Sequence, residues 1–169
     1  KGYGYRPGQT LTSSDHAWNA VRIDGDWHLL DSTWGAGYVE GRQFVRRFTG
    51  YWFDPHPDLF LRTHLPSDGR WQLATRAISK REYELEPYQP SYRFSGLWQH
   101  GFSDTDVVEA LYTGRGLPEA FPAPGGDVRI LNAPLSESVV AGALLTFKIE
   151  AQRGSTAALI NNDRWVHLT

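Results

Sequence analysis

Two side chains, His16 and Asp31, have the types and the spacing to do chemistry together. An imidazole beside a carboxylate is half of a nucleophilic triad, because the carboxylate fixes the tautomer of the base and stabilises the imidazolium once it forms. The third member would be a nucleophile, and the chain has no cysteine to serve as one. A histidine and an aspartate on adjacent strands are also common as an ordinary surface hydrogen bond. The pair alone therefore leaves catalysis and a structural contact both open.

A β-hairpin would bring the two residues together. The sequence predicts strands over 17–23 and 27–31, and Asp24-Gly25 between them is a strong signal for a two-residue turn. Such a turn pairs Ile23 with Asp26 and thereby fixes every other pair of the ladder. A one-residue bulge would change this register and put the histidine and the aspartate on opposite faces.

The predicted register places the candidate residues on one face of the hairpin. His16 falls opposite Thr33, and Trp18 falls opposite Asp31. Because side chains alternate between the two faces of a strand, all four project from the same face. Asp31 is then the diagonal neighbour of His16 and within its reach. We therefore predict that His16 and Asp31 are hydrogen-bonded in the folded chain.

Two tryptophans, Trp18 and Trp34, are candidates to line a substrate cleft beside this pair. Trp18 shares the face of the pair, and together with Trp27 it could exclude water and so strengthen the contact. For Trp34 the first interpretation is core packing, with a place in the cleft as the alternative. The same two interpretations apply to Tyr51.

The remaining histidines of this half predict no metal centre. His28 should project from the face opposite His16, and we interpret it as a partly buried structural residue. His56 and His64 flank a short predicted helix, but no cysteine and no suitably spaced carboxylate completes a zinc pattern. We therefore expect no metal and no cofactor.

Short elements should follow the hairpin. The turn residues, prolines and cap signals predict a surface loop over 35–50, an aromatic strand over 51–53, a helix over 58–64 stopped by Pro66, a strand over 71–73 and, after the capping box of Ser79 and Glu82, a helix to about Leu85. These elements belong to the first of two expected domains, residues 1–90.

A proline-containing linker is expected over 87–92. The second expected domain, residues 91–169, starts at the end of this linker. Apolar residues at helical spacing predict a helix over 104–112, capped by Ser103 or Asp104 and ended by Gly114. Strands are then predicted over 128–131, 144–150, 157–160 and 165–168. Their spacing is typical of a β-sandwich, which this chain would leave incomplete.

Composition narrows the class of protein. Hydrophobic residues make up 40% and charged residues 21%, which is the balance of a globular protein. A net charge of −2 without a basic stripe argues against a nucleic-acid binder, and no apolar run is long enough for membrane insertion. The chain has no methionine, so we expect a piece of a longer protein. Arginine outnumbers lysine 14 to 3, which hints at a GC-rich bacterial genome, while compartment and oligomeric state stay unassigned.

Two motifs resemble those around the histidine and aspartate of the transglutaminase-like superfamily: the segment 15–21, which reads DHAWNAV, and the segment 27–34, which reads WHLLDSTW. Further segments, 51–53, 57–66, 71–73 and 78–97, resemble the kyphoscoliosis peptidase and cytokinesis-protein-3 group within it. The resemblance covers roughly residues 1–97. Its motifs are specific because several of them occur in the same order at plausible spacing.

The resemblance implies an α+β fold, namely the C-terminal part of a papain-like transglutaminase core with an antiparallel sheet, followed by an incomplete Ig-like β-sandwich. It implies the catalytic histidine role for His16 and the aspartate role for Asp31, with the cysteine upstream of this chain. The implied activity is acyl transfer through a thioester, on a protein or peptide substrate. The alternative is a degenerate domain that has lost catalysis and serves as a protein interaction or scaffold module.

Overall fold

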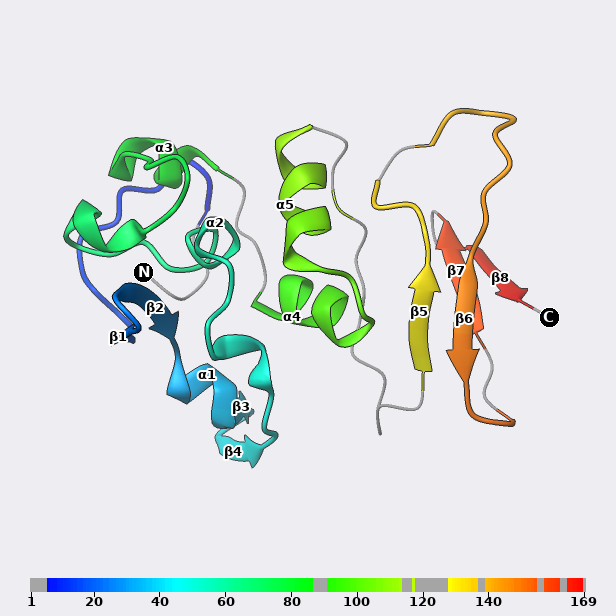
Figure 1. The fold of residues 1–169 in the computed structure, drawn as a ribbon, viewed down its shortest axis with the longest axis horizontal. Helices are drawn as coiled ribbons and strands as arrows, with labels where there is room; N and C mark the ends of the chain where they lie inside the picture. The colour runs from blue at the N-terminus through cyan, green and yellow to red at the C-terminus, as the bar shows by residue number, and fades with distance from the viewer. Residues whose placement is uncertain are drawn as a thin grey trace.

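The structure is a computed structural model that describes residues 6–86, 91–113, 117, 128–136, 139–154, 157–161 and 164–168. Short helices and small antiparallel sheets alternate along it, so the predicted mixture of α and β structure is confirmed. Figure 1 shows the first hairpins and the helices on one side and the strands β5 to β8 on the other. Within the described part, no helix is long and apolar enough to cross a membrane.

The first hairpin has the predicted turn and register. Strands β1 (Asn19–Ile23) and β2 (Asp26–Leu30) pair antiparallel, with Ile23 opposite Asp26 and Asn19 opposite Leu30. Asp24 and Gly25 both have positive φ, 49° and 101°, as a two-residue turn between right-twisted strands requires. The predicted register is confirmed for these pairs, but the predicted pairs of His16 with Thr33 and of Trp18 with Asp31 are not formed, because the ladder ends at Leu30 and α1 begins at Ser32.

The segment after the hairpin differs from the predicted loop over 35–50. Helix α1 (Ser32–Ala36) follows at once, and strands β3 (Gly37–Glu40) and β4 (Gln43–Arg46) form a second hairpin. Gly41, in the turn between them, has a φ of 61°, which a glycine adopts without strain. Glycine and arginine in this segment suggested a loop, but its aromatic and β-branched residues pair across the two strands.

Two predicted strands are single turns of 3₁₀ helix instead. The segment expected as an aromatic strand is η1 (Gly50–Trp52), which the Thr49 side chain caps, and only Phe53 makes a β-bridge, to Leu30. The segment 71–73 lies in and just after η2 (Gly69–Gln72), which Asp68 caps. Local side-chain hydrogen bonds to backbone N–H groups favour such turns over extended strands, and these caps were not read from the sequence.

The short helices are confirmed in kind. Helix α2 (Pro57–Phe60) is shorter than predicted, because residues 61–63 continue as turns. Helix α3 (Lys80–Leu85) has both bonds of the predicted capping box, between Ser79 and Glu82. Helix α5 (Asp104–Tyr112) has its predicted bounds and is capped by Ser103. Its expected end at Gly114 lies outside the described residues.

Helix α4 (Ser91–Gln99) was not predicted and packs with α5, while α4 also contacts η1 and α5 contacts α2. These helices close one buried core, which is made of Leu29, Tyr51, Trp52, Leu59, Phe60, Phe94, Leu97, Val107, Ala110 and Leu117. The core thus contains residues from both sides of the expected boundary between residues 90 and 91. That division into two domains stays a prediction, and residues 87–90 of the expected linker lie outside the described part.

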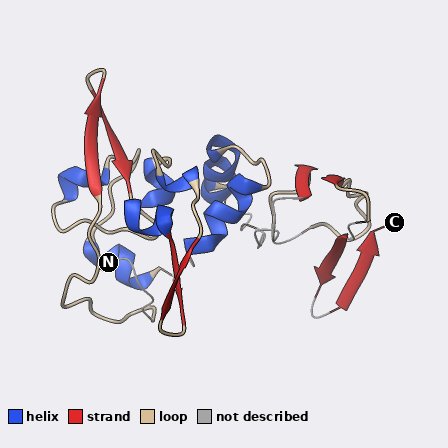
Figure 2. Cartoon of the chain, turned by 90° about the horizontal axis from the view of Figure 1, so that it is seen from below, coloured by secondary structure: helices blue, strands red, loops and turns tan. Residues whose placement is uncertain are grey.

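The four predicted C-terminal strands are present as β5 (Val128–Asn132), β6 (Lys148–Ala151), β7 (Ala157–Asn161) and β8 (Arg164–Leu168). β6 begins four residues later than predicted. β5 pairs with β6 and β7 pairs with β8, each antiparallel, and no ladder joins the two pairs within the described residues (Figure 2). The Ig-like β-sandwich therefore stays a prediction.

Candidate active site

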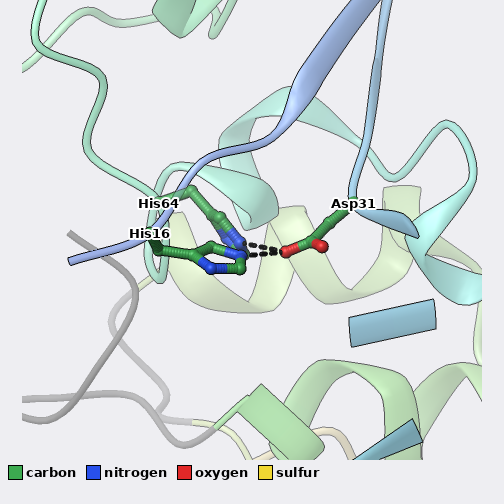
Figure 3. Close-up of side chains that lie close together, drawn as sticks. All are labelled: His16, Asp31 and His64. Carbon is green, nitrogen blue, oxygen red and sulfur yellow. Dashed lines mark hydrogen bonds and ion pairs between the residues drawn. The ribbon is translucent and has the colours of Figure 1, made fainter. Parts of the chain in front are cut away.

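The side chains of His16 and Asp31 are hydrogen-bonded. His16 Nε2 lies 2.5 Å from Asp31 Oδ2, and the two side chains are 7% and 0% exposed (Figure 3). His16 lies just before β1 and Asp31 directly after β2, so the hairpin brings both to one end of the ladder. The predicted contact is present, whereas the catalytic roles of the two residues stay a prediction.

Asp31 also begins a helix, which the strand prediction missed. The ladder stops at Leu30, and Asp31 Oδ1 accepts the backbone N–H groups of Thr33 at 2.9 Å and Trp34 at 3.0 Å as the N-cap of α1. The Asp31 N–H donates to the Trp52 carbonyl at 2.9 Å. A carboxylate is favourable at a helix start because it satisfies free N–H groups at the positive end of the helix.

A second histidine, His64, contacts the same carboxylate. Its Nε2 lies 3.0 Å from Asp31 Oδ2, and its side chain is fully buried (Figure 3). The ring stacks on Phe60 with centroids 3.9 Å apart. Sequence reasoning missed His64 because its position depends on how the turn after α2 packs against the hairpin. The available signal was that His64 lies within the segment 57–66, which resembles the family.

Both candidate cleft tryptophans pack against the imidazole rings of His16 and His64. Trp34 stacks on His16 at a centroid distance of 5.2 Å and meets His64 edge-on at 4.5 Å. Trp18 lies 6.3 Å from His16 and 5.0 Å from His64. Rings packed this closely keep water from the hydrogen bonds they cover. Trp27, also expected to exclude water, lies instead against Trp71 at 5.0 Å and is 45% exposed.

Trp18 also lines an open groove. The groove has a volume of about 510 Å³, and its lining includes Trp18, Leu29, Trp27, Pro66 and Trp71. Its mixed aromatic and aliphatic lining is typical of a ligand site. Trp34 is not among its lining residues. The role of either tryptophan in a substrate cleft stays a prediction.

Burial and hydrogen bonding oppose each other at the site. Burial alone would raise the pKa of Asp31, but the hydrogen bonds from His64 and His16 and the N–H of Trp34 outweigh it, so the pKa lies below its ordinary value. Burial lowers the pKa of His64, which its bond to Asp31 only partly counteracts. At neutral pH, Asp31 is therefore an ionised carboxylate that contacts a neutral His64 and the ring of His16 through the same oxygen.

The same three residues are, among those that the structure describes, the cluster whose donor atoms could hold a metal ion, since these atoms lie within 4.8 Å of one another. In a tetrahedral zinc site with bonds of about 2.0–2.2 Å, two ligand atoms lie roughly 3.3 Å apart. The 2.5 Å between His16 Nε2 and Asp31 Oδ2 is shorter than that spacing and corresponds to a hydrogen-bond contact. The donor set does not fit an ion without rearrangement, and the expected absence of a metal stays a prediction.

Two of the other histidines, His28 and His56, lie in separate contacts. His28 Nδ1 pairs with Asp54 Oδ1 at 2.9 Å, and its side chain is 29% exposed. His56 caps α2 by accepting the Asp58 N–H on Nδ1 at 3.2 Å, and its backbone N–H donates to Asp104. Neither histidine takes part in the site.

Comparison with known proteins gives transglutaminase-like relatives. The kyphoscoliosis peptidases of Mus musculus and Homo sapiens are each 43% identical to the chain over 114 residues, which is 66% of this chain and 17% of the relative. Lim and transglutaminase domain protein ltd-1 of Caenorhabditis elegans is 28% identical over 128 residues, 67% of this chain and 17% of the relative. Hillarin of Drosophila melanogaster is 32% identical over 112 residues, 56% of this chain and 14% of the relative.

These homologues are consistent with a transglutaminase-like group, and they confirm the resemblance read from the motifs of the chain. Within that group, kyphoscoliosis peptidase is the relative with the highest identity of the four. The matched segment spans about a sixth of the length of these relatives. No family model matches the chain, and no solved structure matches it.

Proposed function

We propose that the protein is a transglutaminase-like cysteine peptidase or acyl transferase that acts on protein amide bonds, with His16 as the base and Asp31 as the carboxylate that orients it. The observation that carries the proposal is the buried 2.5 Å contact between these two side chains in a chain homologous to kyphoscoliosis peptidase. Such a pair has a use in nucleophilic catalysis because the carboxylate fixes the imidazole tautomer.

The chemistry follows from which ring nitrogen is held. Asp31 engages Nε2 of His16, so Nδ1 is the nitrogen that exchanges a proton with the nucleophile. A cysteine thiol gives its proton to Nδ1 and its sulfur attacks the amide carbon. The carbon–nitrogen bond then breaks, and the leaving amine takes the proton from the imidazolium, which leaves a thioester. Water attacking the thioester completes a peptidase cycle, whereas a second amine completes a cross-link.

The nucleophile has to come from another part of the protein, because this chain has no cysteine. The proposal places it upstream, as the family resemblance implies. A thiolate at a helix start beside a protonated histidine is stabilised by both, which lowers the pKa of the thiol. The proposal also gives Trp18 and Trp34 a place beside the reacting groups, since both rings contact His16.

The absence of a cysteine also favours a second candidate function. The chain would then be a degenerate transglutaminase-like domain that binds partner proteins, with residues 91–169 as a further interaction module. In that case the hydrogen bond between His16 and Asp31 persists as a structural contact without turnover.

The two functions are separated by labelling the longer parent protein with iodoacetamide across a pH series and locating the adduct by mass spectrometry. The enzymatic proposal expects one reactive cysteine that is labelled well below the range of a free thiol, whose pKa is about 8.5. The present chain is the matched control and should take up no label at a thiol. A parent without an upstream cysteine, or one labelled only near the ordinary thiol range, would favour the binding module.

A further inference from the structure

The carboxylate of Asp31 is fully occupied by donors. Its Oδ1 accepts two backbone N–H groups, from Thr33 and Trp34, and its Oδ2 accepts ring nitrogens of His16 and His64. An ionised carboxylate offers about four lone-pair sites, so no acceptor position is left over. With donors on both oxygens, the carboxylate cannot rotate without breaking at least one buried hydrogen bond.

The contact with His64 requires one particular tautomer. His64 is neutral because burial lowers its pKa, and Asp31 Oδ2 needs a donor, so the proton must be on Nε2 and Nδ1 must accept. Thr63 Oγ1 lies 2.7 Å from His64 Nδ1 and 3.2 Å from the Phe60 carbonyl. The Thr63 hydroxyl donates to the Phe60 carbonyl, and when His64 holds its proton on Nε2 the free Nδ1 can also accept from this hydroxyl. A hydroxyl that offers its proton to Nδ1 favours the tautomer that donates to Asp31.

The ring of His64 is held in place by aromatic packing. It stacks on Phe60 in α2 at an interplanar angle of 11°, and the edges of Trp34 and Trp18 pack against it. α2 itself is tied down at Asp58, whose carboxylate accepts hydrogen bonds from Thr75 and from the hydroxyl of Tyr112 in α5. The donor on Asp31 is thus fixed by α2 and the core together with the two tryptophans.

We infer that His64 is a positioning residue of the candidate site, which with Thr63 orients the carboxylate of Asp31 and through it the imidazole of His16. The functional meaning of this inference rests on the proposed catalytic roles of His16 and Asp31. The geometric claim is independent of them and concerns this chain alone. An ordinary buried histidine would fill space in the core, whereas this one adds a directed donor to a buried carboxylate.

Two substitutions of His64 distinguish the effect of its N–H donor from the effect of its ring volume. His64→Phe keeps an aromatic ring to stack on Phe60 but removes the N–H, and His64→Gln loses the ring but keeps an N–H donor at a similar reach. The readouts are the ¹⁵N shifts of the ring nitrogens and the carboxyl ¹³C titration of Asp31, measured on the full 169-residue chain. Among the described residues, the titratable side chains that act on Asp31 and His64 here are His16, His64 and Asp31 themselves, and the charge of the amino terminus also lowers the pKa of His64.

We expect His64 in the unaltered chain to show the neutral tautomer with the proton on Nε2. His64→Phe should raise the pKa of Asp31, because burial is then opposed by one ring donor fewer, and should shift the ring nitrogens of His16. His64→Gln should leave the pKa of Asp31 and the ring-nitrogen shifts of His16 close to those of the unaltered chain. In a cysteine-containing parent, His64→Phe should lower turnover about 10- to 100-fold, with recovery by His64→Gln.

The inference is overturned if His64 carries its proton on Nδ1, or if His64→Phe leaves the titration of Asp31 and the shifts of His16 unchanged. Should His64→Phe fail to fold, Thr63→Val and its control Thr63→Ser test the same chain of bonds at a smaller cost in volume. Thr63→Val should depopulate the Nε2 tautomer and Thr63→Ser should retain it, and equal spectra for the two would refute the inference. A parent protein without turnover would refute the proposed function while leaving these spectra as the test of the inference.

Discussion

The region up to residue 113 and the strands β5 to β8 differ in what they bury. The first region encloses a core in which Leu97 and Leu59 are 0% and 1% exposed, and the candidate site lies against that core. In the second region large apolar side chains face solvent, for example Leu144 at 95% and Trp165 at 65%. Precise chemistry requires side chains locked by packing, and within the described residues the first region provides such packing at the candidate site.

Substitutions in the two regions should differ most in their effect on turnover. In a parent protein with the nucleophile, His16→Ala should abolish turnover because no other base is held at that position. Asp31→Asn should lower it steeply, by on the order of 10⁴-fold in the serine-protease precedent and by less where a thiolate–imidazolium pair supports itself. Trp165→Ala, in the second region, is the matched control and should leave kcat and KM unchanged. Full activity in Asp31→Asn would show that this aspartate is only structural.

The second largest difference should be in the loss of folding stability when a leucine is truncated in each region. Leu97→Ala removes a fully buried side chain and should lower the free energy of unfolding by about 2–5 kcal/mol, because a cavity is left in the core. Leu144→Ala deletes the same atoms at a position that is 95% exposed and should change it by less than about 0.5 kcal/mol. Urea unfolding of both variants followed by tryptophan fluorescence checks this. Equal losses would mean that the second region has a core that its exposed surface conceals.

The pH dependence of stability should also arise in the first region. The folded-state pKa of His64 lies below its ordinary 6.5, so the unfolded chain binds more protons there and stability is lost as pH falls below 6.5. The lowered pKa of Asp31 adds a second loss as pH falls below 3.8, through the folded-state pKa. His64→Gln should remove the first loss and keep the second. Melting temperatures measured between pH 8 and pH 3 would contradict this if the variant and the unaltered chain had parallel curves.

The smallest expected effect is that of zinc. The contact distances at Asp31 fit hydrogen bonds and not metal coordination, so added Zn²⁺ should leave the melting temperature of the chain unchanged. His64→Phe, which lacks one of the three donor groups, is the control for binding elsewhere on the surface. A rise in melting temperature that the control lacks would assign a metal to the site.

The sequence predicts what local chemistry determines. The Asp24-Gly25 turn determines the register of the first hairpin, which brings the segments of His16 and Asp31 to the same end of the ladder. The capping box at Ser79 and the bounds of α5 follow from similarly local signals. These predictions succeed because each depends on a few neighbouring residues whose conformational preferences agree with the fold.

What the sequence does not predict depends on tertiary packing. The residues 51–53 have the composition of a strand, but Tyr51 and Trp52 are buried in a 3₁₀ turn that α4 covers. His64 resembles any other histidine beside a short helix until the turn after α2 packs against Asp31. For His64 no local pattern exists, because its contact with Asp31 joins residues far apart in the chain, whereas for η1 the local cap of Thr49 acts together with packing against α4.

Asp31 has several structural duties besides its bond to His16. It begins α1, satisfies the buried ring of His64 and joins the first hairpin to Trp52 through its backbone. A domain without a nucleophile would therefore still use this aspartate to stabilise the start of α1 and the ring of His64. An aspartate at this position in a relative is evidence of a preserved scaffold, and inheritance of the activity has to be judged from the histidine and the cysteine.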